Sequence, residues 1–338
     1  MNKEQNHHIR LTSGEISNLW TSYMNDSMAI CGIKYFLSKV EDIQIRSVLE
    51  YALELSQNHV NRVKQIFTEE KYPIPIGFTE ADVNVNASRL FSDTFFLVYI
   101  TSMGKFGLTS YSLALSTSSR SDIRNFYSEC LASTSELFNK AMEIMLEKGM
   151  HTRTPYIPIP NQVETVHDQN FLGNFLNIGK ERPLLAIEIS HLVYNIDRNT
   201  LGKSLIMGLS QVAKIKEVRQ YFERGRDIAQ KHIEVFSSRL SKEHLPSPMT
   251  WDSEVTDSTE APFSDKLMMF HITALIASGI GQYGVSASTS PRADLATMYT
   301  RLSAEIGKYA DEGANIMIKN GWMEKPPQSV DHEDLAKA

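Results

Sequence analysis

The feature that most constrains this chain is an internal repeat. The segment FSDTFFLVYITSMGKFG, which begins at Phe91, returns as FSDKLMMFHITALIASG at Phe263, 172 residues later. Over 59 positions from these phenylalanines the two copies align without a gap, and 17 positions are identical. With an offset of 173 the match continues toward the N-terminus, where Glu15 falls on Glu188. Such a repeat predicts two copies of one structural unit, each of about 140 residues.

The repeat also predicts where the units begin and end. We expect a first unit at residues 10–150, a connector at 151–182 and a second unit at 183–324. Residues 325–338 are polar, and we expect them to form a mobile tail. The connector contains PYIPIPN, whose prolines cannot continue a helix, so it reads as a crossing between the units.

Each unit has the pattern of four helices. The sequence TSGE at Thr12 is a capping box, and apolar residues follow it at helical spacing. A second helix is expected over residues 42–70, ended by the prolines of KYPIPIG. The repeated FSD supplies a serine cap for the third helix, and Gly149 and Gly321 can end the fourth. Because no alternating strand pattern appears, we predict an all-α protein of two tandem antiparallel four-helix bundles.

Bulk properties argue against several classes of protein. A net charge of −6 without a basic stripe does not suit a nucleic-acid binder. Cys31 and Cys130 form no disulfide framework, which favours a reducing compartment. The apolar run from Leu267 to Gly281 contains a histidine and is shorter than the roughly 20 residues of a membrane span. MNKEQNHHIR lacks the apolar core of a signal peptide, so we expect a cytoplasmic protein.

The sequence GIGQYG, Gly279 to Gly284, has the spelling of a dinucleotide-binding turn, G-x-G-x-x-G. Such a turn must follow a strand and open a helix, whereas this one lies inside a predicted helix. In the first copy only Gly107 matches, opposite Gly279. We therefore predict no nucleotide site, and we expect Gly279 to mark a close approach of a neighbouring helix.

Histidines on the apolar stripes of the second unit raise the question of a metal site. Ferritin-like di-iron proteins use Glu-x-x-His pairs on core helices, and Glu-Ile-Ser-His at residues 188–191 has this local spacing. The candidate ligands for iron, manganese or zinc are Glu188, His191, His232 and His271. Against this hypothesis, the first unit has Asn18 and Tyr99 opposite His191 and His271. Histidines in helical cores are more often hydrogen-bonded than metal-bound, so a site without metal is the main expectation.

Two other sets of side chains recur in both copies. An arginine and an aspartate at the start of the fourth helix suggest a cap and a surface ion pair, or else a binding site shared by both bundle tips. These residues are Arg120, Asp122, Arg292 and Asp294. Four tyrosines are expected to be core residues whose hydroxyls reach polar partners: Tyr111, Tyr127, Tyr283 and Tyr299.

The chain also resembles a known family. The residues that carry the resemblance are LTSGEISNLWTSYMNDSMAICGIKYFLSKVED at 11–42, the repeated FSD helix, and HDQNFLGNFL at 167–176. They are similar to uncharacterised proteins of spore-forming bacilli, some of which are labelled spore-coat proteins. The resemblance covers nearly the whole chain and implies two ferritin-like four-helix bundles in tandem. It implies no catalytic residues, because the family has none defined.

These observations lead to one main functional hypothesis and two alternatives. We expect a non-enzymatic structural or interaction protein of a spore-forming bacterium, associated with the spore coat. It would need no cofactor and would bind protein partners or itself, with no nucleic acid and no membrane span. The first alternative is a metal-binding ferritin-like oxidoreductase with its site in the second bundle. The second is a protein that binds an apolar small molecule between its helices.

Overall fold

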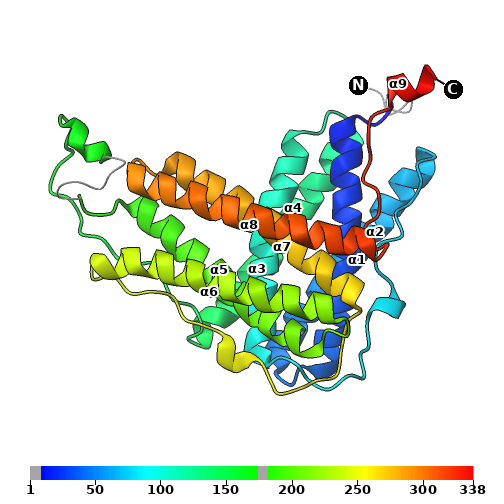
Figure 1. Ribbon diagram of the computed structural model, residues 1–338, viewed down its shortest axis with the longest axis horizontal. Helices are drawn as coiled ribbons and strands as arrows, with labels where there is room; N and C mark the ends of the chain where they lie inside the picture. The colour runs from blue at the N-terminus through cyan, green and yellow to red at the C-terminus, as the bar shows by residue number, and fades with distance from the viewer. Residues whose placement is uncertain (1–8, 174–181, 338) are drawn as a thin grey trace. The chain divides into compact units, whose positions relative to one another are not determined.

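The computed structural model of the protein describes residues 9–173 and 182–337. Residues 174–176, the end of the HDQNFLGNFL segment, lie outside this description. The described residues form eight long α-helices and no β-strand; Phe91 and Val255 make an isolated bridge (Figure 1). The prediction of an all-α protein with two tandem helical copies is confirmed. Within the described residues, no helix combines the length and hydropathy needed to cross a bilayer.

Corresponding helices of the two copies are nearly equal in length. The first copy contains α1 (Ser13–Lys39), α2 (Ile43–Glu69), α3 (Asp93–Ser116) and α4 (Ser121–Glu147). The second contains α5 (Ala186–Val212), α6 (Lys216–Lys242), α7 (Asp265–Thr289) and α8 (Ala293–Lys319). Shorter turns are η2 (Glu80–Asp82), η3 (Gln169–Leu172), η4 (Asp252–Glu254) and α9 (His332–Leu335). All the long helices have 27 residues except α3 with 24 and α7 with 25, as duplication would produce.

Helix ends follow the local signals in the sequence. The Thr12 hydroxyl accepts the Glu15 N–H at 3.3 Å and the Glu15 carboxylate accepts the Thr12 N–H at 2.8 Å, which completes the predicted capping box of α1. Asp42 caps α2 through the N–H groups of its first turn. Gly149 and Gly321 follow α4 and α8 with φ of +66° and +68°, the left-handed conformation that glycine adopts without strain.

The chain forms two compact units that are not continuous in sequence. Unit 1 contains the described residues of Met1–Val85, Ile100–Met142 and Gly321–Ala338. Unit 2 contains Asn86–Tyr99 and the described residues of Glu143–Asn320. The start of α3 therefore belongs to unit 2 and the rest of it to unit 1. The boundaries expected from the repeat refer to the duplicated sequence and stay a prediction.

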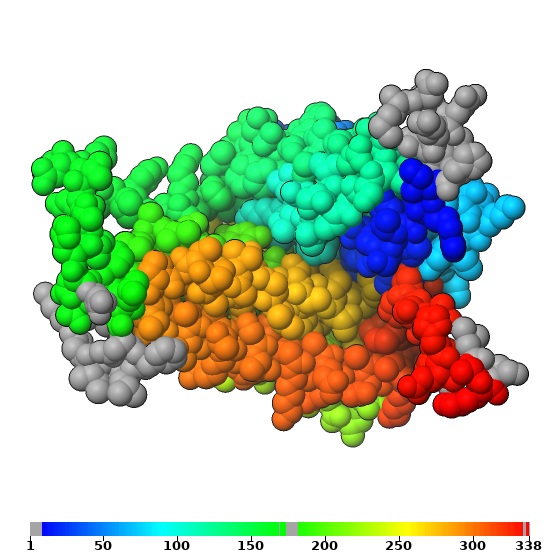
Figure 2. Space-filling view, turned by 90° about the horizontal axis from the view of Figure 1, so that it is seen from above, coloured from blue at the N-terminus to red at the C-terminus, as the bar shows by residue number. Residues whose placement is uncertain are grey.

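Each unit has an apolar core made by the inward stripes of its helices. In unit 2, α7 and α8 lie side by side (gold to orange-red in Figure 2). Its core includes Leu192, Ile196, Phe236, Leu295 and Leu302. The buried apolar residues of unit 1 include Leu19, Leu49, Val63, Phe67 and Ile123. Burial of side chains of this size contributes roughly 1.5–3 kcal/mol each to folding.

The glycines of GIGQYG do not have the role that the sequence suggested. They lie within α7, as predicted, but a Cβ atom at Gly279 would be 3.7 Å from Ile306, an ordinary contact. Gly281 and Gly284 have no such neighbour within 4 Å. The expected close approach at Gly279 is therefore wrong, because the side chain of Ile306 fills the space beside it.

Candidate functional site

Unit 1 contains a cluster of an aspartate, a histidine and a tyrosine that come from three of its helices. The Tyr111 hydroxyl on α3 donates to Oδ2 of Asp26 on α1 at 3.2 Å and lies 3.1 Å from Nδ1 of His59 on α2. The same Nδ1 lies 3.4 Å from Oδ1 of Asp26. Since the single tyrosine proton goes to Asp26, Nδ1 of His59 must carry the hydrogen that it shares with its two oxygen neighbours. Asp26 and His59 are both buried.

Unit 2 repeats this cluster with one change. Asn199 Nδ2 donates to the Tyr283 hydroxyl at 2.8 Å, and that hydroxyl lies 2.9 Å from Nδ1 of His232. The tyrosine therefore donates to Nδ1, and Nε2–H of His232 donates to Glu305 at 3.2 Å. Burial lowers the pKa of His232, although the Glu305 carboxylate opposes this shift. The histidine is thus neutral at pH 7, with its proton on Nε2.

The two clusters are chemically inverted copies of each other. Asp26, His59 and Tyr111 occupy the repeat positions of Asn199, His232 and Tyr283. A carboxylate only accepts hydrogen bonds, whereas the amide nitrogen of asparagine only donates them. The change from aspartate to asparagine therefore reverses the direction of each hydrogen bond at the tyrosine. Sequence reasoning found His232 and both tyrosines but missed Asp26 and Asn199, whose alignment in the repeat was the available signal.

The carboxylate of Glu188, the first predicted metal ligand, accepts hydrogen bonds from an arginine side chain and from backbone N–H groups. Its carboxylate accepts two hydrogen bonds from the Arg182 guanidinium at 2.8 Å, one from Leu185 N–H at 2.8 Å and one from Arg292 N–H at 3.2 Å. Burial would raise the pKa of Glu188, but these donors hold it below its ordinary value. Glu188 therefore ties the start of α5 to the start of α8 as a carboxylate.

The three predicted histidine ligands lie in separate polar contacts. His191 Nε2 lies 2.8 Å from Oγ1 of Thr289, and His271 Nε2 lies 2.9 Å from the Tyr99 hydroxyl. His232 belongs to the cluster with Tyr283 described above. Within residues 9–173 and 182–337, no three His, Cys, Asp or Glu side chains converge on a point that could hold a metal ion. Metal binding by these residues stays a prediction.

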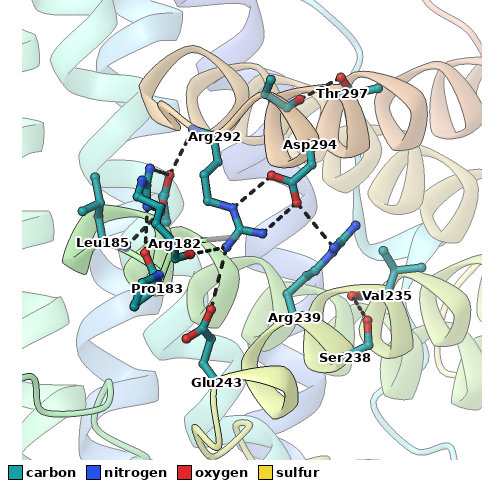
Figure 3. A network of polar contacts seen from close by, with 12 residues as sticks. Arg182, Pro183, Leu185, Val235, Ser238, Arg239, Glu243, Arg292, Asp294 and Thr297 are labelled. Carbon is teal, nitrogen blue, oxygen red and sulfur yellow. Dashed lines mark hydrogen bonds and ion pairs between the residues drawn. The ribbon is translucent and has the colours of Figure 1, made fainter. Parts of the chain in front are cut away.

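Arg292 and Asp294 form the centre of a buried ionic network at the start of α8 (Figure 3). The guanidinium donates to both carboxylate oxygens of Asp294, at 3.0 and 2.8 Å, and to the backbone oxygen of Arg182 at 3.1 Å. Arg239 on α6 and Glu243 directly after it complete the network, 3.4 Å from Asp294 and 3.7 Å from Arg292. Only 3% of Arg292 is exposed and Asp294 is buried too, so the expectation of a surface ion pair is wrong for the second copy.

The first copy contains a smaller version of this network. Arg120 makes the same two bonds to Asp122, at 3.1 and 2.7 Å, and pairs with Glu70. Glu15 accepts the N–H groups of Ser119 and Arg120 at 2.9 and 2.7 Å. Both networks join the ends of helices and use the donors of their arginines internally, which fits a structural role better than anion binding.

The four predicted core tyrosines have polar side chains beside their hydroxyls. Tyr111, Tyr127 and Tyr283 have the expected polar neighbours. The hydroxyl of Tyr299 is buried beside the side chains of Asn195 and Ser286. The amide nitrogen of Asn195 also donates to the carbonyl of its own helix and to Ser286. Tyr299 therefore lies among polar neighbours, as expected.

The fold and the site define a class: duplicated α-helical proteins in which each copy buries a histidine–tyrosine pair among its helices. The chain belongs to the DUF3231 family, described as "Protein of unknown function", which matches residues 1–163 and 174–335. Among solved structures it is similar to one from Bacillus halodurans, described as a "putative spore coat protein". The two are 19% identical with a TM-score of 0.39, over 47% of this chain and 99% of the other. No curated protein matches the chain.

Proposed function

We propose that this protein is a non-enzymatic structural or interaction protein that binds a protein partner through its connector. The observation that carries the proposal is the exposure of large apolar side chains in the described part of the connector. Tyr156 is 86% exposed, Ile159 92% and Val163 100%. This part of the chain forms a narrow strip, green in Figure 2. Exposed apolar side chains gathered on one segment are typical of interaction sites.

The connector has the physical properties of a recognition peptide. Pro155, Pro158 and Pro160 restrict the backbone to extended conformations, so less conformational entropy is lost when the segment is bound. Apolar residues lie between these prolines, and each contributes roughly 1.5–3 kcal/mol when a partner covers it fully. An apolar or aromatic groove on another protein is the complementary surface.

The state of the core histidines supports a role without catalysis. A catalytic group must reach its substrate, whereas His232 is fully buried and bonded on both nitrogens to Tyr283 and Glu305. His59 is likewise buried against Asp26 and Tyr111. These clusters hold helices together, whereas the connector exposes its apolar side chains to solvent.

The spore is the cellular setting that we propose. Support comes from the resemblance of residues 11–42, the FSD helices and residues 167–176 to proteins of spore-forming bacilli. A fluorescent fusion produced in a sporulating bacillus tests the setting. We expect it to accumulate at the forming spore, and fluorescence that stays in the vegetative cytosol at an unchanged level through sporulation would contradict the proposal.

A pair of variants tests the role of the connector. The double variant Ile159→Ser/Val163→Ser should lower the amount of fusion that co-fractionates with spores, because it removes apolar surface without touching either core. Ile43→Ser on α2 is the matched control, since Ile43 is also 80% exposed but lies outside the connector. Equal spore retention of both variants would show that the connector is not the binding segment.

A further inference from the structure

Two contacts inside unit 2 join residues that are separated by the offset of the repeat. The Tyr99 hydroxyl lies 2.9 Å from Nε2 of His271, with the two rings perpendicular and their centroids 5.5 Å apart. The N–H and hydroxyl of Ser88 donate to the Glu260 carboxylate at 2.7 and 2.8 Å. Both pairs are separated by 172 residues, the offset at which the repeat aligns from Phe91 onward, and Ser88 lies three residues before that alignment begins.

Contacts between equivalent positions of two copies are a sign of two-fold symmetry. When two identical surfaces pair by a two-fold rotation, residue i of one meets residue j of the other, and j meets i. A residue meets its own equivalent only at the rotation axis. The equivalent pair Tyr99 and His271, together with the contact of Ser88 and Glu260 at the same offset, indicates that residues 88–99 and 260–271 pair about a local two-fold axis, as the same segments of a homodimer would.

Backbone hydrogen bonds extend this pairing beyond the axis. Ser92 N–H donates to the Glu254 carbonyl at 3.0 Å, and Thr256 N–H donates to the Leu90 carbonyl at 3.0 Å. These two bonds flank the antiparallel bridge between Phe91 and Val255. Within unit 2, the segment before α3 thus pairs with the second copy in the way that one strand pairs with another.

Side chains bury the same segment. Phe91 is fully buried, and its ring stacks on Phe95 with centroids 4.1 Å apart. Its outer edge lies over Gly208 of α5, where a Cβ atom would be 2.6 Å from the ring. Tyr99 and His271 are buried beside it. The second-copy part of unit 2 therefore fits this segment closely, which is the packing found in the core of stable interfaces.

We infer that residues 86–99 of the first repeat and the second repeat form a dimer-type interface that holds without the connector. The kind of partner that this surface fits is a second copy of the repeat, and the chain is a covalently linked dimer of two repeats. The connector is then not needed to keep the two halves together, and it remains available to a partner.

Cleavage of the intact, folded chain tests this inference. A specific protease site replaces residues 157–163, and the purified full chain is cut and passed over a sizing column with light scattering. We expect both fragments to elute together at about the mass of the uncut chain, 38.2 kDa, and to separate only in denaturant. Elution of the two fragments as separate species at micromolar concentration would overturn the inference.

Variants in the segment identify what holds the fragments. Phe91→Ala and the milder Tyr99→Phe are introduced into the cleavable chain, and circular dichroism before cleavage shows that each is folded. We expect at least a tenfold weaker association of the cut fragments for Phe91→Ala and a smaller loss for Tyr99→Phe. Leu113→Ala, at a 62% exposed position of α3 in unit 1, should leave association unchanged. Equal association of all three variants would overturn the assignment of this segment.

Discussion

The rings of Tyr221 on α6 and Tyr309 on α8 stack face to face, with centroids 4.1 Å apart and planes 10° apart. Each hydroxyl donates to the backbone carbonyl of the other tyrosine, at 3.1 and 2.8 Å. The arrangement needs glycine one turn further along each helix. A Cβ atom at Gly225 would lie 2.1 Å from the Tyr309 hydroxyl, and one at Gly313 would lie 2.3 Å from the Tyr221 hydroxyl.

The first copy fills the same space with a different set of residues. Its equivalents of Tyr221, Tyr309, Gly225 and Gly313 are Val48, Leu137, Ala52 and Ala141. All four are buried. Val48 and Leu137 are smaller than the tyrosines, and Ala52 and Ala141 are larger than the glycines, so the total side-chain volume stays similar. Tightly packed cores tolerate an exchange that conserves volume.

We predict that Gly225→Ala destabilises the protein by about 1–3 kcal/mol, because the new methyl group overlaps the Tyr309 hydroxyl. Adding Tyr309→Leu, the residue of the first copy, should recover most of this loss. Urea unfolding followed by circular dichroism measures both. Gly202→Ala is the control, since nothing lies within 4 Å of its Cβ position. A Gly225→Ala protein as stable as the control would refute the packing explanation.

Arg292→Met should cost about 3–5 kcal/mol, because it removes both hydrogen bonds that the guanidinium donates to the buried carboxylate of Asp294. Lys231→Met removes the partner of Glu305 from an ion pair whose lysine is 54% exposed, and it should cost no more than about 1 kcal/mol. Chemical unfolding curves of the two variants give the comparison. Equal losses would mean that burial does not strengthen the network at α8.

His271 should make stability depend on pH in a defined window. Burial lowers the pKa of His271 from 6.5 to about 4, so the unfolded chain binds a proton below pH 6.5 that the folded chain refuses. The free energy of unfolding therefore falls as the pH drops from 6.5 to 4, by on the order of 3 kcal/mol from this group. In His271→Gln this part of the slope should disappear. An unchanged slope in the variant would assign the effect to other groups.

We predict that the protein keeps its melting temperature in excess chelator, because Glu188, His191, His232 and His271 each have a protein partner. Elemental analysis of protein purified without a histidine tag accompanies the melting curve. Stoichiometric iron, manganese or zinc that is lost in His232→Ala would favour the metal-binding alternative and contradict this prediction.

Much of the fold followed from local patterns. The TSGE capping box, the aspartate before α2 and the glycines after α4 and α8 act on backbone groups within one turn, so their effect is independent of the rest of the chain. Because of the repeat, the sequence indicates each helix twice, once in each copy. The pattern Tyr-x-x-x-Gly, present in both α6 and α8, was an available signal for the stacked tyrosines. The pattern does not indicate which other helix each tyrosine packs against.

The sequence by itself determined eight amphipathic helices in two copies, because helical periodicity and caps depend on neighbours along the chain. Only the tertiary structure decided that Tyr99 meets His271, that Tyr309 lies over Gly225 and that Ile306 fills the space beside Gly279. Such contacts depend on where helices cross and how far apart their axes lie. Side chains from distant parts of the chain set those distances together, and no local pattern contains them.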